Sequence, residues 1–127
     1  MVKLMKNEKG FTLIEVVIAI GILGIIAAAF MAGLAGASRA LFIADERATA
    51  ESLARSQMEY FKSQPYSDNG TYTKLPDGDI PEGYDIVWPP TVDNVTGQSG
   101  LQKITITVRH TVNSKDVITL EGYKGDR

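Results

Sequence analysis

A long apolar segment near the N-terminus constrains this chain more than any other feature. Between Phe11 and Ala37 the only polar side chains are Thr12 and Glu15. A helix rises about 1.5 Å per residue, so a helix of this stretch would be about 40 Å long and could cross a bilayer core of about 30 Å. The segment therefore predicts a membrane-spanning helix, in which a carboxylate is unfavourable unless something stabilises it.

The residues at the start of this segment follow a specific pattern. The leader before it carries three basic residues, Lys3, Lys6 and Lys9. It ends in Gly10-Phe11, and Glu15 follows four residues after Phe11. This pattern resembles the N-terminal signal of type IV pilins and of the pseudopilins of type II secretion. The resemblance is close over residues 3–36, looser over 39–64, and weak in the second half of the chain.

The resemblance implies processing and assembly. In this family a membrane-embedded prepilin peptidase cuts after the glycine, which implies cleavage between Gly10 and Phe11 and N-methylation of Phe11. It also implies three kinds of partner: other pilin or pseudopilin subunits, the prepilin peptidase, and an assembly platform in the membrane. The mature chain would be stored in the membrane and then built into a type IV pilus-like filament or a type II secretion pseudopilus.

Glu15 has a physical reason to lie near the new N-terminus. After cleavage, Phe11 would carry an α-amino group that is mostly protonated at neutral pH. In a low-dielectric setting this cation and the Glu15 carboxylate attract strongly and lower each other's desolvation cost. The amine could belong to the same subunit or to a neighbour, and pairing with a neighbour would set the axial register of an assembly. The alternative is a carboxylate that only marks the membrane interface.

Charge on the two sides of the apolar segment predicts its orientation. The leader lysines precede the segment and Arg39 follows it, so the positive-inside rule keeps the N-terminus cytoplasmic and sends the C-terminal part across the inner membrane. From there it would enter a periplasmic or cell-surface filament. A secretory signal peptide would have a shorter apolar core. A single-pass anchor carrying a small binding module explains the length but neither Gly10-Phe11 nor Glu15.

Small residues recur every fourth position along the apolar helix and beyond it. They include Ala28, Ala32, Gly36 and Ala40. This spacing lets helix backbones approach closely in apolar surroundings, so we expect these positions to pack against neighbouring helices. The abundance of alanine and glycine in this segment is the competing explanation.

From residue 38 the pattern becomes amphipathic and predicts that the helix continues to residue 64. One face carries the apolar residues Ile43, Ala50, Leu53, Ala54, Met58 and Phe61. Another face carries charges of alternating sign at Arg47, Glu51, Arg55 and Glu59. Pro65 disfavours helical geometry in the residue before it, so the helix should end by Gln64.

Residues 65–127 read as a small β-rich head. Turn residues fill 65–83, and 91–100 reads as a second loop. Strands are predicted over 84–88, 101–112 and 116–123. In the second strand the alternation places Ile104, Ile106, Val108 and Val112 on the inner face. The fold class is α+β: a long helix packed against a roughly three-stranded antiparallel sheet, the ladle shape of pilins. Its parts are the leader 1–10, the membrane helix 11–37, the amphipathic helix 38–64 and the head 65–127.

The remaining composition excludes several functions. The chain has no cysteine, one histidine (His110) and a net charge of -2, so thiol chemistry is absent and a nucleic-acid-binding basic face is not expected. No catalytic constellation is present, and we expect neither enzyme activity nor a small-molecule substrate. Four acidic residues, Asp77, Asp79, Glu82 and Asp85, could hold calcium, but they lack the EF-hand spacing and a solvated acidic turn is the favoured interpretation.

Within the pilin-like class, three features favour a minor pilin or pseudopilin. The head is small, it has no cysteine for a disulfide, and no proline interrupts the stretch between Phe11 and Gln64. The segment Leu53 to Tyr60 also resembles the minor pseudopilin type that helps initiate filaments of type II secretion.

Overall fold

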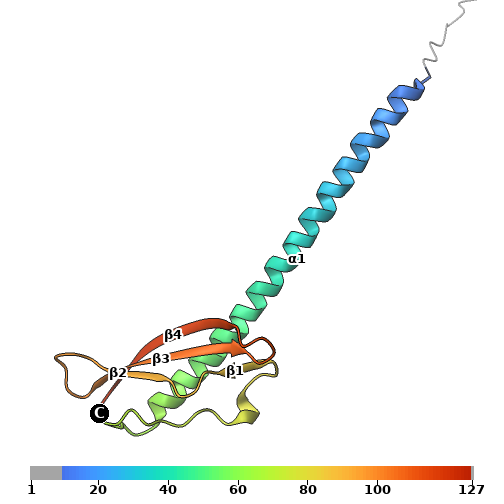
Figure 1. Cartoon of the computed structure of the whole chain (residues 1–127). Coiled ribbons are helices and arrows are strands. Elements are labelled where there is room, and N and C mark those ends of the chain that lie inside the picture. The colour runs from blue at the N-terminus through green and yellow to red at the C-terminus, as the bar shows by residue number, and fades with distance from the viewer. Residues whose placement is uncertain (1–9, 127) are drawn as a thin grey trace, which may run out of the picture. The chain divides into compact units, whose positions relative to one another are not determined.

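The structure is a computed structural model that describes residues 10–126 of the chain, so the leader lysines lie outside the described residues. The elements in chain order are α1 (Leu13–Ser63), the short 3-10 helix η1 (Asp77–Asp79), β1 (Tyr84–Ile86), β2 (Thr91–Asn94), β3 (Leu101–His110) and β4 (Asp116–Gly125) (Figure 1). The chain divides into two compact units, one up to Leu41 and one from Phe42 onward.

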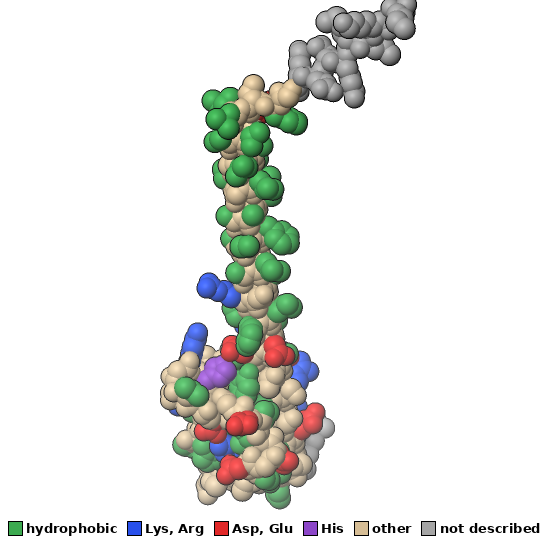
Figure 2. Space-filling view, turned by 90° about the vertical axis from the view of Figure 1, so that its right-hand side faces the viewer, with side chains coloured by type: hydrophobic (Ala, Val, Ile, Leu, Met, Phe, Trp, Pro, Cys, Tyr) green, Lys and Arg blue, Asp and Glu red, His purple; other side chains and the backbone are tan. Residues whose placement is uncertain are grey.

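The first unit is the apolar part of α1. The Thr12 Oγ1 accepts a hydrogen bond from the Glu15 backbone N–H at 3.3 Å, and the Thr12 carbonyl accepts from Glu15 and Val16 at 3.1 Å each. Threonine three residues before glutamate is the capping-box pattern, which explains why the helix begins here. Every described side chain up to Leu41 is exposed, and hydrophobic side chains cover the visible face of this part of the helix (Figure 2).

The second unit combines the last part of α1 with the sheet. Five predicted helix residues are buried: Ala50, Leu53, Ala54, Met58 and Phe61. Ile43, predicted on the same face, is 52% exposed, so that prediction is wrong. The reason is that the buried stretch of α1 begins at Ala50, two turns further along the helix. The helix ends at Ser63, in line with the expected stop before Pro65.

The sheet is antiparallel with four strands, where the sequence predicted about three. Central β3 pairs with all three other strands. The segment Gln102–Thr105 pairs with β2 and with β4, so these two strands lie on opposite edges of β3. β1 pairs with the far end of β3, where Tyr84 lies opposite His110. It is on the same edge of β3 as β2.

β2 lies in the segment predicted to be a loop, and β1 and β2 together form one interrupted edge strand. Five residue steps separate Ile86 from Thr91, but only three separate their partners Val108 and Thr105. The extra residues include Pro89 and Pro90, which have no N–H to donate to the ladder. With four residues and one apolar side chain, Val92, β2 carries no alternation that a sequence pattern could reveal.

The core lies between the sheet and the end of α1. Ile104, Ile106 and Val108 are fully buried on the inner face of β3, as predicted, and pack with Leu53, Met58 and Phe61. Val112, predicted in the same row, is 94% exposed. β3 ends at His110 because its N–H donates to the Lys115 carbonyl at 2.9 Å and closes the turn earlier than predicted.

The side chain of Lys124, on β4, caps the C-terminal end of α1. Its ammonium donates hydrogen bonds to three backbone carbonyls, those of Phe61 (2.7 Å), Lys62 (3.2 Å) and Gln64 (2.6 Å). The last carbonyls of a helix lack helical partners, and a cation is favourable there. The side chain is only 6% exposed, and burial lowers the pKa of its ammonium.

Glutamine side chains fix the segment after α1. Gln57, buried on the helix, accepts from the Leu75 N–H at 2.8 Å, and Gln64 accepts from the Thr73 N–H at 2.9 Å. On β3, buried Gln102 accepts from the Tyr72 hydroxyl at 2.6 Å and donates to the Ser67 carbonyl at 2.9 Å. These bonds satisfy buried polar groups and hold the long loop against the core.

Candidate processing and assembly site

The predicted cleavage pair lies immediately before α1. Gly10 and Phe11 are outside the helix, which starts at Leu13, and the Phe11 side chain is 80% exposed. A β-carbon added at Gly10 would meet no atom within 4 Å. Nothing in the described part of the chain therefore requires a glycine here. A requirement for a small residue at this position would have to come from another molecule.

Glu15 lies in the first turn of α1, one turn from Phe11 along the chain. Its backbone N–H is bound by Thr12, while its side chain is exposed. Between residues 10 and 126, no ion pair involves Glu15. The position satisfies one geometric requirement of the register hypothesis, a carboxylate close to the predicted new N-terminus. The pairing itself stays a prediction.

The first unit presents an apolar surface without a partner in the described part of the chain. α1 is the one helix there that is long and apolar enough to cross a membrane. Water-exposed apolar surface costs roughly 25 cal/mol per Å², so lipid or other helices must cover it. Ala28, Ala32, Gly36 and Ala40 are all exposed, and their predicted packing against neighbouring helices is untested by a single chain.

The comparisons with known proteins bear on this segment. Residues 5–31 match the family described as the prokaryotic N-terminal methylation motif. The chain carries the prepilin-type methylation motif. The matched stretch contains Gly10, Phe11 and Glu15 together with the first part of α1. It is consistent with the type IV pilin and pseudopilin family, whose members are structural proteins. No curated protein and no solved structure matches the chain significantly.

The acidic loop of the second unit does not bring its four carboxylates together as a metal site. Asp85 accepts hydrogen bonds from the Lys74 ammonium and from the Ile86 N–H at 2.8 Å. The bond from Lys74 is the main reason that the pKa of Asp85 is lowered. Asp77 and Asp79 lie in η1, and across residues 10–126 no three His, Asp or Glu side chains are grouped to hold an ion.

His110, the single histidine of the sequence, joins α1 to the sheet. Its Nε2 lies 3.4 Å from a carboxylate oxygen of Glu46, and its Nδ1 lies 3.4 Å from the Gly83 carbonyl oxygen. The imidazole also stacks on Tyr84, with ring centroids 4.9 Å apart. These contacts hold the C-terminal end of β3 beside the start of the second unit.

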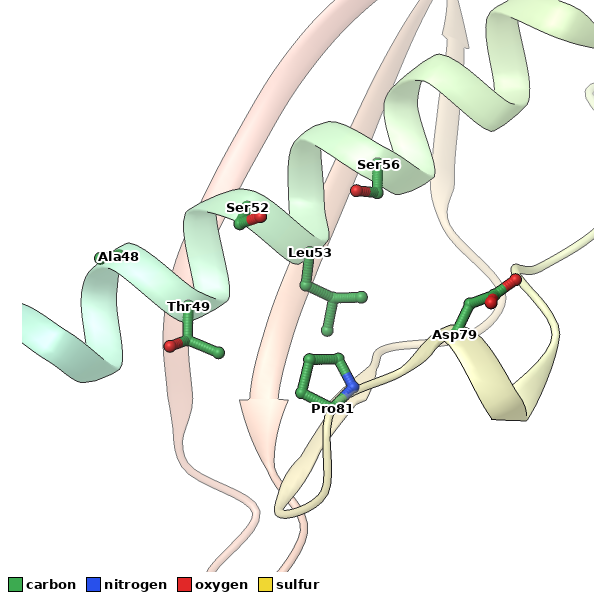
Figure 3. Close-up of a pocket in the computed structure, with 7 residues that line it drawn as sticks. All are labelled: Ala48, Thr49, Ser52, Leu53, Ser56, Asp79 and Pro81. Carbon is green, nitrogen blue, oxygen red and sulfur yellow. The ribbon is translucent and has the colours of Figure 1, made fainter.

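A shallow groove runs along α1 in the second unit (Figure 3). It is lined by Ala48, Thr49, Ser52, Leu53, Ser56, Asp79 and Pro81. Figure 3 shows the Leu53 side chain directed toward Pro81, with Thr49, Ser52 and Ser56 on the same stretch of the helix. Asp79 is the single ionisable side chain in this lining, and among residues 10–126 no hydrogen bond joins its carboxylate to the hydroxyls of Thr49, Ser52 or Ser56.

Proposed function

We propose that this chain is a minor pilin or pseudopilin, a structural subunit that is stored in the membrane and then assembled into a type IV pilus-like filament or a type II secretion pseudopilus. One observation carries the proposal. The methylation motif over residues 5–31 leads into a helix whose side chains are all exposed up to Leu41. The processing signal therefore lies at the start of an exposed apolar helix surface, which other molecules would have to cover.

The residues of the motif would act in sequence. Prepilin peptidase would cut after Gly10, leaving Phe11 with an α-amino group that remains basic after methylation. In the membrane the cytoplasmic end of α1 would hold this cation close to Glu15. During assembly the cation of one subunit would pair with Glu15 of a neighbour, because a carboxylate left alone in an apolar bundle is strongly unfavourable.

Lipid and neighbouring helices would cover the rest of the first unit in turn. The row of small residues through Ala32 and Gly36 would let several helices approach one another in a filament core. The second unit would face the outside throughout, folded around its own core. Its small size, the lack of cysteine and the uninterrupted helix support a minor or pseudopilin role over a major one.

The test is the mass of the mature N-terminus in cells that contain a prepilin peptidase. We expect a chain that begins at methylated Phe11. Gly10→Leu should keep the leader, since the bulky side chain blocks a site that accepts small residues, while Gly10→Ala serves as the matched control and should still be processed. An intact leader on the wild-type chain would instead favour a single-pass anchor that carries a binding module.

A further inference from the structure

Exposed apolar side chains in the second unit concentrate at one end. The second unit as a whole exposes five large hydrophobic residues: Phe42, Ile43, Trp88, Val112 and Tyr123. Trp88 and Tyr123 each carry a polar atom, which makes their exposure ordinary. The three side chains without a polar atom are Phe42, Ile43 and Val112, which are 75%, 52% and 94% exposed.

These three residues belong to neighbouring segments. The Glu46–His110 contact places the end of β3 against the first helical turns of the unit. Ile43 also lines one pocket with Lys115, which lies just before β4, and with Val117, which lies at the start of β4. Val112 lies in the turn that joins β3 to β4. We call this region, residues 42–47 with 111–115, the entry end, because the chain enters the second unit there.

The length of the chain ties the entry end to the membrane. The predicted membrane helix ends at residue 37, five residues before Phe42. Five residues span about 8 Å as a helix and at most about 18 Å when extended. The polar region of each leaflet is roughly 5–7 Å deep outside the hydrocarbon core. The five-residue link keeps Phe42 within about 18 Å of the end of the predicted membrane helix, so the entry end can contact the lipid head groups.

We propose that, while the subunit is stored, the β3–β4 turn inserts Val112 into the head-group region of the bilayer, with Phe42 and Ile43 beside it. The proposal rests on the membrane storage stated under the proposed function. Lipid covers apolar side chains that the chain itself leaves exposed. Arg47 and Lys115 lie in the same region and have no ion-pair partner within residues 10–126, so their charges would face lipid phosphates.

The absence of cysteine makes a site-specific test direct. The full chain with Val112→Cys is labelled with an environment-sensitive fluorophore and placed in vesicles of phosphatidylethanolamine and phosphatidylglycerol, with or without bromine on the upper acyl chain. Ser99→Cys is the matched control. Ser99 is exposed in the turn before β3, and a ten-residue strand of about 30 Å separates the two turns. Trp88 fluorescence checks that both variants keep the fold.

We expect the Val112 label to be blue-shifted and quenched at least about twofold by brominated lipid, since interfacial groups lie about 5–10 Å into the head-group boundary. The Ser99 label should stay in water. Equal behaviour of the two labels in vesicles that carry the protein overturns the proposal and leaves the proposed function intact. A blue shift without bromine quenching, which disappears when the protein is diluted in lipid, also overturns it and assigns the surface to a second copy. Failure of the protein to float with vesicles contradicts membrane storage as well.

Discussion

The two units of this chain differ in where their stability comes from. Up to Leu41 none of the described side chains is buried, and the interactions within the unit are those of a single helix. From Phe42 onward ten hydrophobic residues are buried, and a network of hydrogen bonds joins α1, the loop after it and β4. One unit depends on what surrounds it, and the other carries its own core.

This difference separates two kinds of mutational effect. A substitution in the second unit changes the free energy of unfolding of the chain itself. A substitution in the first unit leaves that quantity unchanged and acts on insertion, processing or contacts with other molecules. A small core of this kind supplies only about 3–5 kcal/mol, so single changes in the second unit should be readily measured. Trp88, the single tryptophan, lies 6.0 Å from Phe61 between ring centroids and reports on the packing of this core.

The largest effect is expected for Ile106→Asp. Ile106 is fully buried between β3 and α1, and an unpaired carboxylate there has no partner that could offset its desolvation. The cost should reach or exceed about 4 kcal/mol, comparable to the whole stability of the unit. Trp88 fluorescence and protease resistance of the full chain in detergent should both show an unfolded second unit. Thr107→Asp, on the opposite face of β3, is the control, and equal damage from both variants would mean that the two faces are assigned wrongly.

A smaller loss is expected for Lys124→Met, which keeps most of the side-chain volume and removes the ammonium. The carbonyls of Phe61, Lys62 and Gln64 would then lose a shared donor, at a cost of about 1–3 kcal/mol. Denaturant titration followed by Trp88 fluorescence measures it. Lys103→Met is the matched control, because Lys103 forms a surface ion pair with Glu121 at 3.0 Å and should matter little. A Lys124→Met chain as stable as the control would contradict a capping role.

Gly122→Ala should cost less, about 1 kcal/mol, since overpacking in a core is typically felt at this scale. A β-carbon at Gly122 would lie 2.5 Å from the terminal methyl carbon of Met58, which must move. Met58 is flexible, so the strain can relax. In a Met58→Ala background the same substitution should cost nothing, and a double-mutant cycle detects that coupling. Gly78→Ala, where a β-carbon meets nothing within 4 Å, is the control.

These residues also show what the sequence could and could not predict about the fold. The 3.6-residue spacing of Leu53 and Phe61 and the alternation of Ile104 and Ile106 are long enough to identify the two faces that meet. Periodicity does not say where a partner element stops, which is why Ile43 and Val112 were wrongly placed in the core. The contact of Lys124 with the end of α1 joins residues about 60 positions apart, and no local pattern encodes it.

For the candidate site, the sequence predicted the residues of the motif, but one chain cannot test their roles. The leader, Gly10-Phe11 and Glu15 form a local motif, and the family match over residues 5–31 covers Gly10, Phe11, Glu15 and the leader from residue 5 onward. A local motif can be found without knowledge of the fold. The roles of Phe11 and Glu15 depend on a peptidase and on neighbouring subunits, which one chain does not contain. Those roles therefore stay predictions.

Glu15→Val separates the two units most clearly, because it changes the first unit and should leave the free energy of unfolding of the second unit unchanged. The substitution makes the membrane helix more apolar, so insertion should be as good or better. If Glu15 pairs with the Phe11 amine of a neighbour, the variant should be inserted, processed and folded, yet recovered in filaments or partner complexes at a small fraction of the wild-type level. Glu15→Gln, which keeps the shape and removes the charge, should show the same loss, since the attraction comes from the charge.

Co-purification with partner subunits measures incorporation, and an N-terminal mass confirms processing. Normal incorporation of a processed Glu15→Val chain would mean that the carboxylate only marks the interface. In that case register would have to come from the apolar and small residues of the first unit.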